Sequence, residues 1–303
     1  MKNMLMVFRS KMKVTVLAAL AVALAASLAD AQQQTSRSTR RGPGGRYAMV
    51  NGLKMYYEVR GRGGVPLVLM HGAFSNVATD FGKMIPALSK NRMIIAIEAQ
   101  GHGHTPDMDS ALTYEGMADR VAELLRQLRV EKADFLGYSM GGGTALYLAA
   151  RHPALVRKFV YIGGASYNAG GYYPQLLEGE AKMTAKDLEG TPWQKAYARM
   201  APNPQDWPKL VEKIKQLDLN WKGLRDNDLR AIKSPSLLMV GDADVVRPEH
   251  VAEMFRLLGG GAPGDIVGLP RSQLAVLPGT THVTIITKTD WLLSMVTPFL
   301  SAK

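Results

Sequence analysis

Short apolar runs alternate with helix-type patterns along most of this chain. The runs predict buried β-strands near residues 66–70, 92–98, 133–138, 158–163, 236–241 and 273–277. Residues 113–128, by contrast, carry apolar side chains at the three- and four-residue spacing of an α-helix. Strands that alternate with helices predict an α/β fold with a doubly wound, mostly parallel sheet, whose carboxyl edge carries the functional loops.

Two segments interrupt this alternation. Residues 47–60 predict a β-hairpin with Asn51 and Gly52 at its turn. Residues 167–232 contain helical patterns and proline breaks but no convincing strand, which predicts a mostly helical insertion, here called the cap, in a core of residues 47–166 and 233–303. The aromatic residues of this cap are Tyr167, Tyr172, Tyr173, Trp193, Tyr197, Trp207 and Trp221. They either line a substrate pocket or form the core of the cap itself.

The N-terminal segment has the features of an export signal. A basic start precedes an apolar stretch at residues 14–28, and Ala29-Asp30-Ala31 resembles a cleavage site. We predict a signal peptide over residues 1–31 and a flexible basic leader over residues 32–46. The apolar stretch is shorter than the ~20 residues of a membrane span, which disfavours an uncleaved anchor. The mature protein is therefore expected to be periplasmic or secreted, without stable membrane insertion.

Composition and charge narrow the class of protein. With 47% hydrophobic residues the chain can bury a large core, and without cysteine it forms no disulfide. The formal net charge is +11, but residues 1–46 hold eight basic residues against one acid and so contribute +7 of it. The predicted folded part is only weakly basic, and a nucleic-acid partner is disfavoured.

The strongest chemical signal follows the strand predicted at residues 133–138. Gly137-Tyr138-Ser139-Met140-Gly141 joins that strand to a helix-forming stretch. A turn this sharp needs small residues two positions before and after the serine, because a side chain there would collide with the neighbouring strand or helix. The turn lifts the Ser139 hydroxyl out of the backbone at the top of the sheet, where it can act as a nucleophile.

Three further motifs accompany this turn. An earlier strand runs into His71-Gly72, a later strand ends in Gly241-Asp242-Ala243-Asp244, and the last strand precedes Pro278-Gly279-Thr280-Thr281-His282 on a predicted loop. With these four motifs in this order, residues 47–303 resemble the α/β-hydrolase superfamily. Its esterase, enol-lactonase and carbon–carbon hydrolase branch, which carries a helical cap, is the most similar.

The resemblance implies a catalytic triad of Ser139, Asp244 and His282. His282 would take the proton of Ser139, and Asp244 would orient the imidazole and stabilise its protonated form. Asp242 remains the alternative acid, since it lies near the end of the same strand. The same region could also be interpreted as a metal cluster of Asp242, Asp244, Glu249 and His250. The resemblance, however, implies no metal and no cofactor.

The resemblance also implies an oxyanion hole built from the backbone amides of Met140 and Ala73. The residues predicted to line the substrate pocket are Phe74, Tyr138, Tyr173 and Trp193. Residues 100–105 match a glycine-rich loop of the family, except that His104 stands where Arg or Ser is usual. No mechanistic role follows for His104.

The sequence therefore predicts a serine hydrolase that cleaves a small or medium carboxylic ester through an acyl-enzyme intermediate. Hydrolysis of an enol-lactone, or of a carbon–carbon bond beside a ketone, is an alternative on the same scaffold. A non-catalytic ligand-binding protein is the alternative from another class, although binding alone would not require a complete triad. The expected partner is a small ester-like molecule, and the pattern does not determine the oligomeric state.

Overall fold

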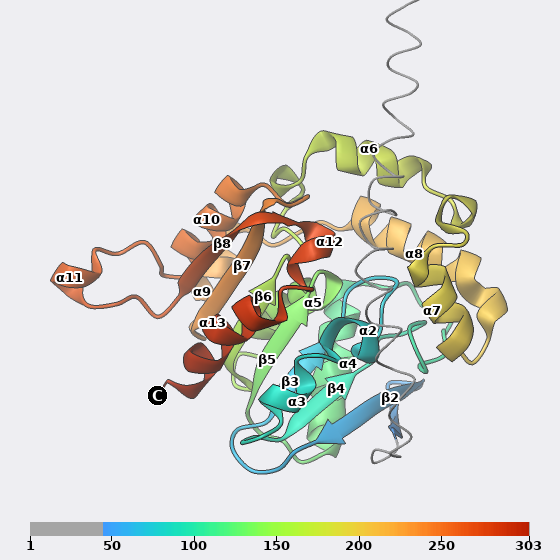
Figure 1. Cartoon of the computed structure of the whole chain (residues 1–303), viewed down its shortest axis with the longest axis horizontal. Helices are drawn as coiled ribbons and strands as arrows, with labels where there is room; N and C mark the ends of the chain where they lie inside the picture. Colours follow the sequence, from blue (N-terminus) through green and yellow to red (C-terminus); the bar gives the residue numbers. More distant parts are fainter. Residues whose placement is uncertain (1–44, 303) are drawn as a thin grey trace, which may run out of the picture.

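The computed structural model describes residues 45–302, so the predicted signal peptide and nearly all of the predicted leader lie outside the described residues. One sheet of order β1-β2-β4-β3-β5-β6-β7-β8 runs through this part of the chain (Figure 1). Its strands are β1 (Arg46–Val50), β2 (Leu53–Arg60), β3 (Leu67–Met70), β4 (Ile94–Ile97), β5 (Ala133–Tyr138), β6 (Val156–Ile162), β7 (Ser236–Ala243) and β8 (Gln273–Thr281). Strand β2 is antiparallel to β1 and β4, and the other neighbours are parallel. This arrangement confirms the predicted α/β fold.

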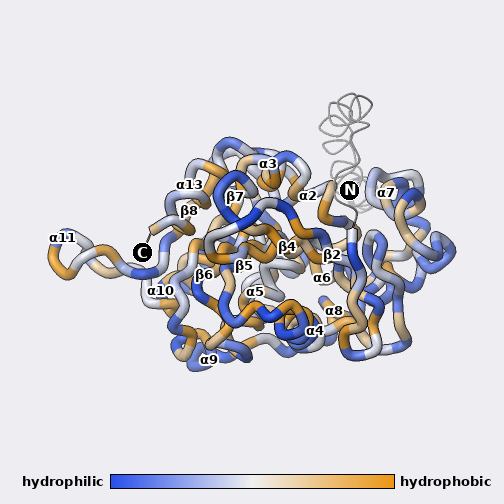
Figure 2. The backbone as a smooth tube through the Cα atoms, turned by 90° about the horizontal axis from the view of Figure 1, so that it is seen from below, coloured by the Kyte–Doolittle hydropathy of each residue, from blue (hydrophilic) through white to orange (hydrophobic). Residues whose placement is uncertain are grey.

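Helices cover both faces of the sheet. One layer contains α4 (Tyr114–Gln127), α5 (Met140–Arg151) and α10 (Pro248–Leu257). The other contains α2 (Val77–Phe81), α3 (Ile85–Leu88), α12 (His282–Ile285) and α13 (Thr289–Ser301). Successive side chains of β3 alternate between them, with Val68 in the first core and Leu69 in the second. Because both faces of the sheet are covered at its centre, strands such as β3 and β4 are buried throughout and appear in the sequence as continuous apolar runs, which is visible for β4 in Figure 2.

Two local predictions are confirmed at the start of the fold. In the hairpin of β1 and β2, Asn51 and Gly52 have φ values of +49° and +82°, as a tight two-residue turn requires. The predicted helix is α4, and Thr113 caps it by accepting a hydrogen bond from the Gly116 amide.

A mostly helical stretch connects β6 to β7. It contains η1 (Ala169–Gly171), α6 (Pro174–Lys182), η2 (Ala185–Leu188), α7 (Pro192–Met200), η3 (Pro204–Asp206), α8 (Trp207–Asn220) and α9 (Asp226–Ala231). Helices α6, α7 and α8 lie together at one end of the molecule (Figure 1), and α8 contacts both α6 and α7. Helix α9 instead contacts α5 and α10. The domain boundaries at residues 166–167 and 232–233 stay predictions.

The last strand differs from the prediction. Strand β8 continues past Pro278 to Thr281, and His282 is the first residue of α12 rather than part of a loop. The side chain of Asp242 holds the extension, because it accepts hydrogen bonds from the amides of Gly279 and Thr280 at 3.0 and 3.1 Å. Thr281 then caps α12 by accepting a hydrogen bond from the Thr284 amide.

A short arm between α10 and β8 extends away from the body and carries α11 (Gly264–Val267) (Figure 2). Its apolar residues Ile266, Val267 and Leu269 are exposed. Within residues 45–302, every helix is too short or too polar to cross a bilayer.

Candidate active site

Ser139 lies at the turn from β5 to α5 with a φ of +53°, in the region that non-glycine residues rarely adopt. The turn leaves no space for side chains on either side. A Cβ atom on Gly137 would lie 2.0 Å from the Gly141 carbonyl oxygen, and one on Gly141 would lie 2.0 Å from the Met70 carbonyl oxygen. The Ser139 amide donates a hydrogen bond to the Ile162 carbonyl of the neighbouring strand, which stabilises this strained backbone conformation. The two glycines are therefore a steric requirement of the turn.

Three side chains from separate elements form a hydrogen-bonded chain at this turn. Ser139 Oγ lies 2.9 Å from His282 Nε2, and His282 Nδ1 lies 2.8 Å from Asp244 Oδ1. The buried Tyr138 hydroxyl donates to the carbonyl of His282 at 2.9 Å, which fixes the backbone beneath the imidazole. The structure thus brings Ser139, Asp244 and His282 together and places Tyr138 as a support of the histidine.

The electrostatics of this chain suit proton transfer from the serine. Burial alone would raise the pKa of Asp244, but His282 and the amides of Val246 and Gly241 outweigh it and lower the pKa below its ordinary value. Burial alone would lower the pKa of His282, but Asp244 raises it above its ordinary value. An ionised Asp244 accepts the Nδ1 proton, so Nε2 presents its lone pair to Ser139.

The residues of the alternative acid and of the possible metal cluster have other partners in the structure. Asp242 binds the backbone before His282, and those hydrogen bonds lower its pKa. Glu249 lies 3.6 Å from Arg247, and His250 Nε2 lies 2.7 Å from Ser166 Oγ. Among the residues described, no three His, Asp or Glu side chains are grouped to hold a metal ion.

The loop after β3 faces the same turn. The Gly72 amide donates to Asp80 Oδ2 at 2.8 Å, and the Phe74 amide donates to His102 Nε2 at 3.2 Å. No hydrogen bond within residues 45–302 occupies the Ala73 amide. The Met140 amide opens α5, where first-turn N–H groups lack an acceptor within the helix. The amides of Ala73 and Met140 can therefore donate to an oxyanion.

Two buried histidines clamp this loop to the loop after β4. His71 Nδ1 donates to the Gly72 carbonyl at 2.7 Å, and His71 Nε2 accepts from the Ala99 amide at 3.1 Å. His102 Nδ1 donates to the Gln100 carbonyl while its Nε2 binds Phe74. Burial lowers the pKa of each histidine to about 4. Both rings are therefore neutral at pH 7, as these hydrogen bonds require.

Comparison with known proteins agrees with this geometry. The model of the family described as "alpha/beta hydrolase fold" matches residues 65–207. This range includes the loop after β3 and the turn at residues 137–141, which we call the nucleophile turn. The chain belongs to the α/β-hydrolase superfamily.

Several named relatives of this α/β hydrolase are hydrolases. The serine hydrolase BPHL of Homo sapiens is 29% identical over 221 residues, which cover 68% of this chain and 72% of that protein. The 2-hydroxymuconate semialdehyde hydrolase of Pseudomonas sp. (strain CF600) is 34% identical over 127 residues, 38% of this chain and 45% of that protein. The enol-lactonase of Burkholderia xenovorans LB400 shares the fold, with a TM-score of 0.65 and 21% identity over 85% of this chain and 100% of that chain. The protein is a hydrolase.

The remaining pocket residues of this α/β hydrolase occupy different environments. The centroid of the Phe74 ring lies 6.4 Å from that of Trp193 and 5.6 Å from that of Trp207. The loop after β3 therefore contacts α7 and α8. Tyr173 is 42% exposed at the start of α6. Of the predicted pocket residues, the structure brings Phe74 and Trp193 together and leaves Tyr173 partly exposed.

Sequence reasoning missed two carboxyl groups near His282. Burial raises the pKa of Asp80 to about 6 although its oxygens accept hydrogen bonds from Ser75 and Gly72. Burial raises the pKa of Glu180, on α6, to about 7. Neither residue belongs to a motif, and each reaches the site through an element far from His282 in sequence.

His104 has a structural partner. Its Nδ1 lies 2.9 Å from Glu98 Oε2, and its ring stacks on Tyr56 with centroids 4.3 Å apart. His104, which departs from the family pattern, therefore packs and hydrogen-bonds within the loop after β4.

Proposed function

We propose that this α/β hydrolase cleaves a small or medium carboxylic ester through an acyl-enzyme intermediate. The observation that carries the proposal is the chain of hydrogen bonds from Ser139 through His282 to Asp244, at 2.9 and 2.8 Å. The strained turn presents one hydroxyl to Nε2 of the His282 imidazole. Two unoccupied amides, of Ala73 and Met140, face the same turn and supply the second requirement of acyl transfer.

The steps follow from these positions. Ser139 Oγ attacks the ester carbonyl carbon while its proton passes to His282 Nε2, and the amides of Ala73 and Met140 stabilise the negative oxygen of the tetrahedral intermediate. The intermediate expels the alcohol, which takes the proton from His282. Water then attacks the acyl-enzyme and gives its proton to His282. Collapse releases the acid and returns the proton to Ser139.

Activity-based labelling tests the nucleophile. A fluorophosphonate should label the wild-type protein, Ser139→Ala should abolish labelling, and His282→Ala should strongly reduce it. Turnover of p-nitrophenyl esters of graded chain length should be almost lost in both variants. The double variant should be scarcely worse than either, because members of a triad act as a unit.

The fold offers a matched control. Ser166 Oγ also lies 2.7 Å from a histidine nitrogen, that of His250, but it donates to the Asn168 carbonyl and lies outside the nucleophile turn. Ser166→Ala should therefore retain labelling. Near-native kcat in Ser139→Ala would disprove the mechanism. Labelling of the wild type without turnover of any ester would instead favour the lactone, carbon–carbon or binding alternatives.

We also propose export through the signal peptide predicted over residues 1–31. The apolar stretch and the Ala29-Asp30-Ala31 site support it. Cell fractionation followed by N-terminal sequencing should find the protein outside the cytoplasm with a new N-terminus near residue 32. Cytoplasmic protein that keeps this segment would contradict export.

A further inference from the structure

The loop that carries the predicted catalytic acid pairs with a segment outside the main sheet. Residues 244–247, here called the acid loop, lie between β7 and α10. Residues 166–172, here called the entry segment, lie between β6 and α6. Val246 and Tyr172 form an isolated antiparallel bridge. The two segments therefore lie side by side, although they are far apart in the sequence.

Further contacts strengthen this pairing. The Arg247 amide donates to the Gly171 carbonyl at 2.9 Å. His250 Nε2 lies 2.7 Å from Ser166 Oγ, and the hydroxyl proton of Ser166 goes to the Asn168 carbonyl, so His250 is the donor. The contact leaves no space, since a Cβ atom on Gly171 would lie 2.0 Å from Ser166 Oγ and 2.3 Å from His250 Cδ2. The entry segment is thus packed against both the acid loop and the first turn of α10.

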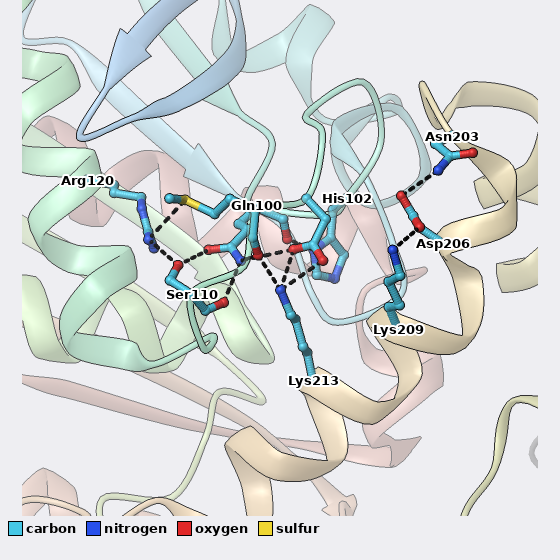
Figure 3. Close-up of polar contacts among 10 residues, drawn as sticks. Gln100, His102, Ser110, Arg120, Asn203, Asp206, Lys209 and Lys213 are labelled. Carbon is cyan, nitrogen blue, oxygen red and sulfur yellow. Dashed lines mark hydrogen bonds and ion pairs between the residues drawn. The ribbon is translucent and has the colours of Figure 1, made fainter.

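The helical stretch that follows the entry segment is itself fixed to the core. Lys213 Nζ of α8 lies 2.8 Å from both oxygens of Asp107, in the loop after β4 (Figure 3). Beyond α8, the Leu224 amide donates to the Tyr167 carbonyl of the entry segment at 2.6 Å. The entry segment is therefore held independently of the acid loop and can serve as a support for it.

The acid loop in turn orients the carboxylate of Asp244. Its Oδ1 accepts hydrogen bonds from the amides of Val245 and Val246 at 2.7 and 3.3 Å. The same oxygen lies 2.8 Å from His282 Nδ1. The direction of this oxygen therefore depends on the backbone that bridges to the entry segment. A shift of that backbone would turn the carboxylate away from the imidazole.

We propose that the entry segment positions the acid of the catalytic triad: the pairing of residues 171–172 with residues 246–247 holds the Asp244 carboxylate within hydrogen-bond distance of His282. This inference rests on the proposed acyl-enzyme mechanism, in which Asp244 is that acid. The residues of the entry segment are positioning residues, because they act on the reaction through Asp244.

The Arg247 amide can be removed with loss of the side chain as the matched control. The φ of Arg247 is −61°, which proline adopts, and the Arg247 carbonyl would still accept from the amides of His250 and Val251. Arg247→Pro therefore deletes the hydrogen bond to the Gly171 carbonyl, whereas Arg247→Ala deletes only the side chain. Both variants lose the same guanidinium, so the difference between them reports the amide.

NMR titration of the histidines measures the effect without any substrate, and His282→Ala assigns the signal of His282. Asp244 raises the pKa of His282 in the wild type. That pKa should fall in Arg247→Pro and stay close to the wild-type value in Arg247→Ala. Gly171→Ala forces the two segments apart, so it should act like Arg247→Pro, and it decides the question if that variant does not fold. An unchanged pKa in Arg247→Pro and Gly171→Ala would overturn the proposal.

Turnover gives a second readout. In Arg247→Pro, kcat on one p-nitrophenyl ester should fall about tenfold with KM nearly unchanged, less than the ~10²-fold that a 1 Å misplacement can cost. Ser236→Ala removes a buried hydrogen bond to Ser272 at the opposite end of β7, so it should lower the Tm but leave kcat and the pKa of His282 unchanged. Equal losses in Ser236→Ala would show general destabilisation and refute the positioning role. If the wild type cleaves no ester but the pKa falls as expected, the positioning role holds and only the ester substrate is refuted.

Discussion

Two aspartates at the end of β7 have different roles because they face different groups. Asp244 is 4% exposed and binds His282, whereas Asp242 is exposed and binds the backbone of residues 279–280. In the proposed mechanism, an ionised carboxylate beside the imidazole stabilises the cation that forms when His282 takes the serine proton. A carboxylate bound to the backbone only shapes the loop.

Substitution of each aspartate should separate these roles. Asp244→Asn should lower kcat on the order of 10²–10⁴-fold, because the imidazole loses its orienting charge. Asp242→Asn should cost much less, since it only loosens the end of β8. Steady-state kinetics of both variants on one ester checks this ranking, and the reverse ranking would transfer the acid role to Asp242.

The pH profile provides an independent check on the same pair. His282 must be neutral to act as a base, so kcat/KM should fall as the pH drops through its raised pKa, which lies above the ordinary 6.5. Asp244→Asn removes the main group that raises this pKa, so the acid limb of the residual activity should move to lower pH. An unchanged limb would assign that titration to another group.

At the scale of elements, the loop after β3 connects the nucleophile turn to helices α7 and α8. Phe74 follows the Ala73 amide in sequence and packs against Trp193 and Trp207. Trp193 is only partly buried, whereas Trp207 is buried. We therefore expect Trp193 to contact substrate and Trp207 to stabilise the packing of the helices.

Trp193→Ala should change the preference for acyl chain length. Loss of about 50 Å² of apolar contact costs about 1.3 kcal/mol, so long-chain esters should lose roughly tenfold in kcat/KM while an acetyl ester changes little. Tyr173→Ala should shift the ranking less, because Tyr173 is 42% exposed. An equal loss for all chain lengths together with a lower Tm would identify Trp193 as part of the helical core.

At the scale of the whole molecule, the buried side chains that hold the loop after β3 also make the stability of the fold depend on pH. The pKa values of His71 and His102 are lowered to about 4, and that of Asp80 is raised to about 6, in each case by burial. Their hydrogen bonds hold the backbone of residues 72–74. Protonation of the histidines would disrupt that loop and the fold together.

The two buried histidines should therefore lower the free energy of unfolding as the pH drops from 6.5 to 4. The unfolded histidines take up protons near pH 6.5 but the folded ones only near pH 4, which costs roughly 3 kcal/mol of stability for each. Asp80 acts in the opposite direction, since it gains its proton near pH 6 when folded and near 3.8 when unfolded. Asp80 thus offsets about one of the two histidine losses, and Glu180, whose pKa burial raises to about 7, offsets a similar amount, so the histidine effect is measured by comparing the wild type with a histidine variant.

Urea unfolding of the wild type and of His102→Gln from pH 7 to pH 4.5 measures this effect. The variant should be less stable at pH 7 but should lose less stability on acidification, because one of the two histidine contributions is absent. Parallel pH dependences would show that His102 is not the buried neutral group described above.

Local sequence determined the elements of this protein. Residues that cover both faces of a sheet must be apolar throughout, so β3, β4, β5 and β7 were evident as continuous runs. Asn51 and Gly52 both adopt positive φ. Gly137 and Gly141 must lack a side chain, because a Cβ atom at either position would collide with a backbone oxygen. The constraints at Asn51-Gly52 and at Gly137 act between residues close in the sequence, so a local sequence pattern reveals them.

Only the tertiary structure decided which side chains meet. The choice between Asp242 and Asp244 depends on where β8 lies, and the extension of β8 to Thr281 depends in turn on Asp242. The clamp of His102 on Phe74 joins loops that follow different strands. Hydrogen bonds and charges act over a few ångströms of space between residues distant in the chain, and no local pattern records those distances.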